Sequence, residues 1–80
     1  MAENEYHVAS YVVNTRPEHG VGVAGRINAV PGLEVHAEHQ GKLVVTAEAS
    51  DVRELADFAA SLATVEGVIS VAPVYHEYES

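Results

Sequence analysis

The segment from residue 33 to residue 38 alternates strictly between apolar and polar side chains, and this alternation most constrains the fold. The apolar positions are Leu33, Val35 and Ala37, and the polar positions are Glu34, His36 and Glu38. Because successive side chains of a strand point to opposite faces, the segment predicts a half-buried β-strand with its apolar set inward. A connection of hairpin length, residues 39–41, contains Gly41, and residues 42–48 then predict a second strand with Leu43, Val45 and Ala47 inward.

A strand and a helix are predicted before this hairpin. Residues 7–13 are rich in β-branched and aromatic side chains, and they end at turn-forming residues, which indicates a strand. Between residues 18 and 30, Val23, Ile27 and Val30 recur at helical spacing. Three glycines in the same stretch, at positions 20, 22 and 25, weaken this helix by roughly 1 kcal/mol each relative to alanine. Pro31 and Gly32 end it.

A helix and a strand are also predicted after the hairpin. Ser50 is a suitable N-cap, and Asp51 and Glu54 place negative charge in the first turn, where the helix dipole favours it. The apolar stripe of this helix consists of Val52, Leu55, Phe58, Ala59 and Leu62. Residues 68–75 predict the last strand, which Pro73 restricts to the edge of a sheet or to a strand end. We expect residues 76–80 to form a mobile acidic tail.

The predicted order β-α-β-β-α-β is that of a ferredoxin-like α+β sandwich. Two similar halves support it, since residues 29–35 and 64–71 each contain a helix end, a glycine and the start of a strand. We therefore expect a single domain over residues 1–80, with its core in residues 6–75. The four-stranded antiparallel sheet should have the strand order four-one-three-two and carry both helices on one face.

The sheet face opposite the helices is predicted to be open, with small apolar residues at its centre and acidic residues at its rim. We assign Ala9, Tyr11 and Val13 to the helix side of the first strand, and Ile69 and Val71 to that side of the last strand. The open face then carries Val8, Ser10, Val12, Val44, Thr46, Ser70, Ala72, Glu34 and His36. Such a face can accept a helix or a second sheet, although a dimer partner can also cover it.

Composition and motifs exclude several functions. The 80 residues include 12 acidic and 4 basic side chains, and the formal charge of −8 makes nucleic acid an unfavourable partner. No cysteine is present to bind a cluster or to act as a thiolate nucleophile. The five histidines are scattered, so we expect no metal and no other cofactor. The serines lack a nucleophile elbow, and we expect no enzyme activity.

Two further features of the sequence do not change this interpretation. Gly20, Gly22 and Gly25 form a Gly-x-Gly-x-x-Gly pattern, but the chain is too short for a dinucleotide fold and lacks an evident acidic partner for the ribose. The N-terminus has no basic and apolar signal region, and no apolar stretch approaches the roughly 20 residues of a membrane span. We therefore expect a cytoplasmic protein with no transmembrane segment.

A set of segments together resembles one known family, and they are residues 8–13, 27–35, 41–45 and 65–71, and Val74-Tyr75-His76 followed by acidic residues. In this combination, nearly the whole chain resembles the NapD family of nitrate reductase maturation proteins. The resemblance implies a cytoplasmic chaperone that binds the twin-arginine signal peptide of the periplasmic nitrate reductase catalytic subunit and delays its export until cofactor insertion is complete. It also implies that the open sheet face holds this signal peptide as a helix.

This resemblance gives the open face an expected occupant. Ser10, Val12, Thr46, Ser70 and Ala72 are the expected platform for the apolar helix of the peptide. Glu34 and Glu48 are the expected partners of its arginines, because carboxylates accept charge-assisted hydrogen bonds from guanidinium groups. Tyr75 and His76 are expected to border the groove, although Tyr75 has the alternative of only packing at the sheet edge.

A second interpretation uses the same order of elements. An ACT-like or transcription-factor-type module for ligand sensing or dimerisation would bind amino acids in loops or at a dimer interface. A metal carrier is a third and weaker alternative, because the chain has no cysteine.

Overall fold

The computed structural model describes residues 6–79, which form four strands and two α-helices in the predicted order. Strand β1 (Tyr6–Thr15) is followed by a short 3-10 helix, η1 (Pro17–His19), and by helix α1 (Gly20–Asn28). Strands β2 (Leu33–His39) and β3 (Lys42–Ala49) form the central hairpin. Helix α2 (Val52–Thr64) and strand β4 (Val68–Glu79) complete the chain.

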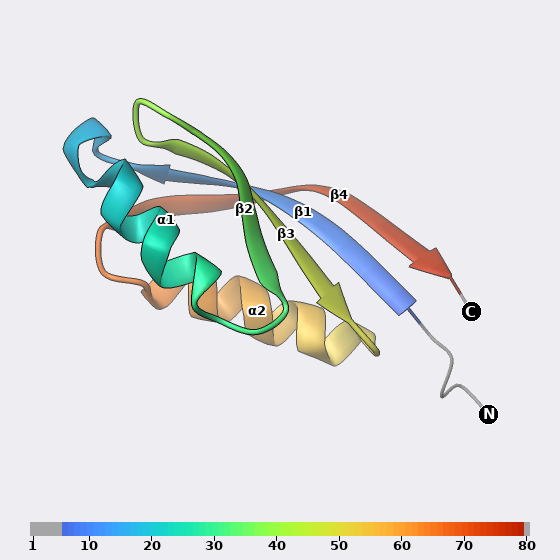
Figure 1. Cartoon of the computed structure of the whole chain (residues 1–80). Coiled ribbons are helices and arrows are strands. Elements are labelled where there is room, and N and C mark those ends of the chain that lie inside the picture. The colour runs from blue at the N-terminus through green and yellow to red at the C-terminus, as the bar shows by residue number, and fades with distance from the viewer. Residues whose placement is uncertain (1–5, 80) are drawn as a thin grey trace.

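The four strands form one antiparallel sheet in the order β2-β3-β1-β4, as predicted. Both helices lie on the same side of this sheet and leave its other face uncovered (Figure 1). Strand β4 is an edge strand, which is the position that Pro73 requires because it has no backbone N–H for a second neighbour. The α+β class and the sandwich architecture are therefore confirmed.

The core lies between the sheet and the two helices. Its fully buried members include Val13 from β1, Leu43 and Val45 from β3, Ile27 from α1 and Leu62 from α2. The predicted inward residues of β1, Ala9, Tyr11 and Val13, are all buried. The inward positions of β3 and the helical stripe from Val23 to Ile27 are confirmed in the same way.

The last strand differs from its prediction in length and regularity. Pairing with β1 continues from Val68 to Glu79, so residues 76–79 belong to the sheet rather than to a tail beyond it. Two register shifts interrupt the ladder, where Val74 and Ile69 have no partner in β1. Ile69 is 66% exposed, so its assignment to the buried helix side is wrong, whereas Val71 packs against the core.

A β-bulge in β2 makes part of the prediction from strict alternation wrong. Val35 pairs with Val45, but Ala37 already pairs with Val44, so one residue, His36, is inserted between them. Beyond the bulge the two faces exchange, because side chains alternate with a period of two. Ala37 is exposed beside Val44 instead of buried, and Glu38 lies on the helix side opposite Leu43.

Glu38, which is half-buried on the helix side, gains polar contacts there. Its Oε2 accepts a hydrogen bond from the Gly41 backbone N–H at 3.2 Å. The same carboxylate lies against Gly20, the first residue of α1, where a Cβ atom would collide with it. Negative charge at this place is favoured by the N-terminus of α1.

Local chemistry fixes the hairpin and the start of α2. Gln40 and Gly41 have φ values of 52° and 87°, which are typical of a two-residue type I′ turn between His39 and Lys42. The N-cap of α2 is Asp51 rather than the predicted Ser50. The Asp51 side chain accepts a hydrogen bond from the Glu54 backbone N–H at 2.9 Å, while Ser50 donates to the Glu54 carboxylate.

Candidate functional site

The uncovered face of the sheet is organised in rows that cross the strands. Each row joins residues that are partners in the ladders. Counted from Val8 along β1, the first three rows are Glu48–Val8–Glu77, Glu34–Thr46–Ser10–Tyr75 and Ala37–Val44–Val12–Ala72. The fourth row is His39–Lys42–Asn14–Ser70. We call this surface the open face.

The first two rows form an acidic end of the open face, which contains Glu34, Glu48 and Glu77. Glu48 and Glu77 flank Val8 from the two strands next to β1. Tyr6 donates a hydrogen bond from its hydroxyl to Oε1 of Glu48 at 2.9 Å. Oε1 of Glu34 lies 3.9 Å from Nε2 of His36.

The third row is an apolar centre of small side chains. Val12 lies at its middle, flanked by Val44 and Ala72, and the β2 bulge adds Ala37 at the rim. Val44 is 39% exposed, so this row is open to solvent rather than covered by the fold. Because none of these side chains is long, a helix can approach the sheet closely here.

The fourth row forms a polar end without carboxylates. Asn14 donates a hydrogen bond from Nδ2 to Oγ of Ser70 at 3.1 Å. Lys42 is the paired neighbour of Asn14 on the other side. Within the acidic end, His36 and Thr46 of the second row form a cross-strand hydrogen bond of 2.7 Å between Nε2 and Oγ1.

The structure brings most of the predicted site residues to this one face. Val8, Ser10, Val12, Val44, Thr46, Ser70, Ala72, Glu34, His36, Glu48 and Tyr75 all occupy it. His76 does not, because the next position along β4 points to the opposite side. Its ring contacts the buried His7, with Nδ1 of His7 3.0 Å from Nε2 of His76.

Five members of the open face are not among the predicted site residues: Asn14, Ala37, His39, Lys42 and Glu77. Glu77 was placed beyond the last strand, although the alternation from Tyr75 to Glu77 would have assigned it to the same face. Ala37 was assigned to the core, and nothing in the strict alternation of residues 33–38 indicates the bulge that exposes it.

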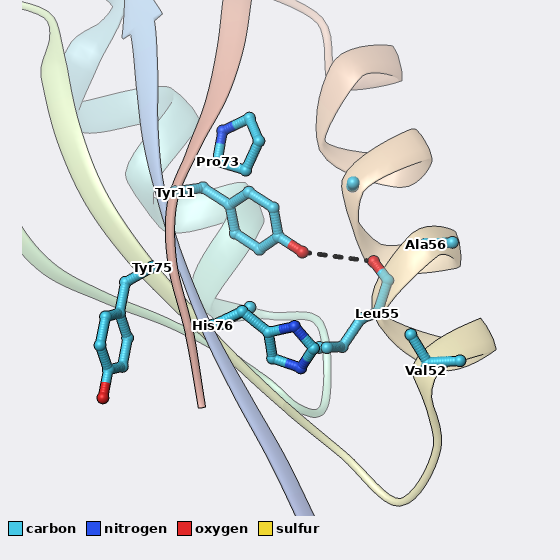
Figure 2. A pocket seen from close by; sticks show the side chains of 9 residues that line it. Tyr11, Val52, Leu55, Ala56, Pro73, Tyr75 and His76 are labelled. Atoms are coloured by element: carbon cyan, nitrogen blue, oxygen red, sulfur yellow. Dashed lines mark hydrogen bonds between the residues drawn. The ribbon is translucent and has the colours of Figure 1, made fainter. Parts of the chain in front are cut away.

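A separate apolar pocket of about 290 Å³ lies on the helix side, between α2 and the sheet (Figure 2). Tyr11 crosses it and donates a hydrogen bond to the Leu55 carbonyl at 3.3 Å. Val52 and Ala56 line it from the helix, and Pro73 and His76 from β4. The Tyr75 ring points away from this pocket, toward the other side of β4.

The histidines do not converge on a candidate metal centre in the described chain. His7 and His76 are neighbours, with ring centroids 5.2 Å apart, but residues 6–79 contain no group of three potential ligands. Each of the other three histidines lies elsewhere on the surface.

Comparison with known proteins identifies the family. The model of the NapD protein family matches residues 6–80. The chain belongs to the NapD family. The chaperone NapD of Escherichia coli K12 is 37% identical over 76 residues, which cover 92% of this chain and 87% of that protein. The chaperone NapD of Paracoccus pantotrophus is 31% identical over 71 residues, which cover 89% of this chain and 63% of that protein.

A solved NapD structure has the same fold. The solution structure of the E. coli Tat proofreading chaperone NapD matches with a TM-score of 0.85 and 37% identity, and the match covers 99% of this chain and 84% of that one. The matched relatives are named chaperones, so this NapD-family chain is a chaperone-type protein and not an enzyme. No helix within residues 6–79 is long and apolar enough to cross a bilayer.

Proposed function

We propose that this NapD-family chain is a cytoplasmic proofreading chaperone that binds the twin-arginine signal peptide of a periplasmic nitrate reductase. The peptide lies as a helix on the open face and is withheld from export until the cofactors of the reductase are inserted. The observation that carries this proposal is the uncovered sheet face, whose small apolar centre adjoins three carboxylates.

The chemistry of the open face complements that of an export signal. Such a peptide brings a basic segment and an apolar segment, and the open face offers carboxylates beside small apolar side chains. Guanidinium groups form strong hydrogen bonds with carboxylates, and the apolar helix face is removed from water against Val12, Val44 and Ala72. Because the free peptide must become ordered, binding has a conformational cost and its affinity should be moderate.

Calorimetric titration with a synthetic signal peptide tests this function directly. We expect saturable binding at micromolar peptide, accompanied by shifts of the amide NMR signals of β1 and β3. A peptide of the same composition in scrambled order is the control. Absence of both heat and shifts with the authentic peptide would contradict the proposed function.

Substitution of the platform tests where the peptide binds. Ala72→Phe places a ring in the apolar centre, where it prevents close approach of a helix, and should weaken binding by about tenfold or more, equivalent to ~1.4 kcal/mol. Ala60→Phe is the matched control, because Ala60 is an exposed residue of α2, on the other side of the sheet. Equal binding by both variants, with circular dichroism spectra like that of the parent, would exclude the open face as the site.

A further inference from the structure

The open face is electrostatically asymmetric along the direction of its strands. Within the four rows described above, the carboxylates are those of Glu34, Glu48 and Glu77, and they lie in the first two rows. Its one lysine, Lys42, lies in the fourth row at the other end. A ligand that is charged at one end can lie on this face in two directions, and the electrostatic energies of these two directions differ.

The spacing of the rows matches the geometry of a helix. Rows one and three are four residues apart along β1, from Val8 to Val12, which corresponds to about 13 Å at roughly 3.3 Å per residue. An α-helix covers this distance in about nine residues. A peptide can therefore place basic side chains over Glu48 and Glu77 and an apolar stretch over Val12 only when its axis follows the strands.

We infer that the bound peptide has one direction, with its basic N-terminal segment over Glu48 and Glu77 and its apolar segment over Val12, Val44 and Ala72. This inference rests on the proposed function, which identifies the ligand as a signal peptide. It adds the direction in which the peptide binds and the contribution of Glu77. The peptide then runs from the start of β1 toward its end, parallel to β1 and antiparallel to β3 and β4. The reverse direction places the arginines beside Lys42 and leaves the acidic end without a partner.

Paramagnetic tags on the peptide distinguish the two directions. One synthetic peptide carries a nitroxide at its N-terminal end and a second carries it at its C-terminal end. The N-terminal tag should broaden the amide signals of Val8 and Glu77, and the C-terminal tag should broaden those of Asn14 and Ser70. Diamagnetic reduced tags provide the reference intensities.

The outcomes of this experiment distinguish the direction of the peptide from the proposed function on which it rests. Saturable binding with the reversed pattern, or with equal broadening at both ends, overturns the direction and leaves the proposed function standing. No binding of either tagged peptide, nor of the untagged one, overturns both. If the tagged peptides fail to bind but the untagged peptide binds, the tags themselves prevent binding. The nitroxide is then attached one residue further out and the broadening is measured again.

Charge-neutralising substitutions test whether Glu77 and Glu48 determine the direction of the bound peptide. Glu77→Gln and Glu48→Gln should each weaken binding about three- to fivefold, which is the range for a solvent-accessible ion pair. The glutamine amide at position 48 can still accept the Tyr6 hydrogen bond. Glu66→Gln is the matched control, because it removes the same charge from the loop between α2 and β4.

The same variants are then titrated with a peptide whose arginines are replaced by glutamine. The loss of affinity caused by Glu77→Gln and Glu48→Gln should disappear with this peptide, because it has no guanidinium group that could pair with either carboxylate. If Glu66→Gln weakens binding of the authentic peptide as much as the other two, only net charge matters, and the assignment of the arginines to the acidic end is wrong.

Discussion

Tyr11 ties the central strand β1 to helix α2 by a side-chain hydrogen bond. It is only 4% exposed, and its hydroxyl donates to the Leu55 carbonyl. Burial raises the pKa of Tyr11 above its ordinary value, because desolvation disfavours the phenolate. The folded state therefore holds this proton more tightly than the unfolded state does.

This pKa shift predicts a specific alkaline loss of stability. The contribution of Tyr11 is fully present below the unfolded pKa of about 10 and is lost as pH rises through the higher folded pKa. Tyr11→Phe should cost about 1 kcal/mol at pH 7 by removing the hydrogen bond, yet lose less stability between pH 9 and pH 11 than the parent does. Urea unfolding at a series of pH values measures both effects, with Tyr75→Phe as the exposed control.

An equally steep alkaline decline in Tyr11→Phe and in the parent would contradict this assignment. Tyr75 is 53% exposed, so Tyr75→Phe removes a hydroxyl without disturbing the core and shows the effect of the substitution itself.

At the scale of single residues, a sequence pattern predicts the face of a side chain only while the strand stays regular. The positions of Ala9, Tyr11 and Val13 follow from simple alternation. Ala37 does not, because the β2 bulge reverses the phase of the strand after Val35. A bulge is decided by how β2 fits β3 and by contacts such as that of Glu38 with Gly41, which sequence spacing does not reveal.

At the scale of an element, α1 is the helix whose own sequence supports it least. Gly22 and Gly25 both have helical backbone conformations and exposed positions, and a Cβ added to either would meet no atom within 4 Å. The glycines therefore serve no packing purpose in the described chain. They have the conformational cost of glycine in a helix, as the sequence predicts.

Alanine at these two positions should stabilise the protein. Gly22→Ala and Gly25→Ala are each expected to raise the free energy of unfolding by about 0.5–1 kcal/mol, because the unfolded chain loses conformational freedom and no contact is disturbed. For a domain of this size the melting temperature should rise by about 4–8 °C per kcal/mol. Differential scanning calorimetry measures the change.

Gly41→Ala is the control for this interpretation of the glycines. Gly41 has φ of 87°, and a Cβ atom there would collide with the Thr15 backbone carbonyl, so the substitution should destabilise the protein. A loss of stability in Gly22→Ala or Gly25→Ala would show that these glycines have a role outside the helix itself. Such a loss of stability would indicate that the Gly-x-Gly-x-x-Gly pattern has a role of its own.

At the scale of the whole molecule, element order was more predictable than element ends. Two helical stripes and four strands, separated by Pro31-Gly32, Gly41 and Gly67, leave few ways to build a two-layer α+β domain. The open face and most of its residues follow from that topology. The length of β4 and the apolar pocket under α2 do not, because both depend on how far β1 and β4 remain paired and on how closely α2 packs.

The pocket under α2 provides a test of stability that is independent of peptide binding. Ala56 is exposed on α2 and lines the pocket, so Ala56→Leu adds apolar contact with little strain and should stabilise the fold by roughly 0.5–2 kcal/mol. Because Ala56 and the open face are on opposite sides of the sheet, the peptide dissociation constant should not change. A large change in affinity would indicate that the pocket, rather than the open face, receives the ligand.

The net charge of −8 predicts how peptide binding responds to salt. A basic peptide is attracted to the whole acidic molecule before it contacts the open face, and salt screens this attraction because the Debye length falls from about 10 Å at 0.1 M to 3 Å at 1 M. Association in stopped-flow experiments should therefore slow several-fold between 0.05 M and 0.5 M NaCl, while dissociation changes less. The peptide with glutamine in place of arginine should respond much more weakly, since its apolar contacts are not screened. Equal salt dependence of the two peptides would mean that the acidic end of the open face does not select the arginines.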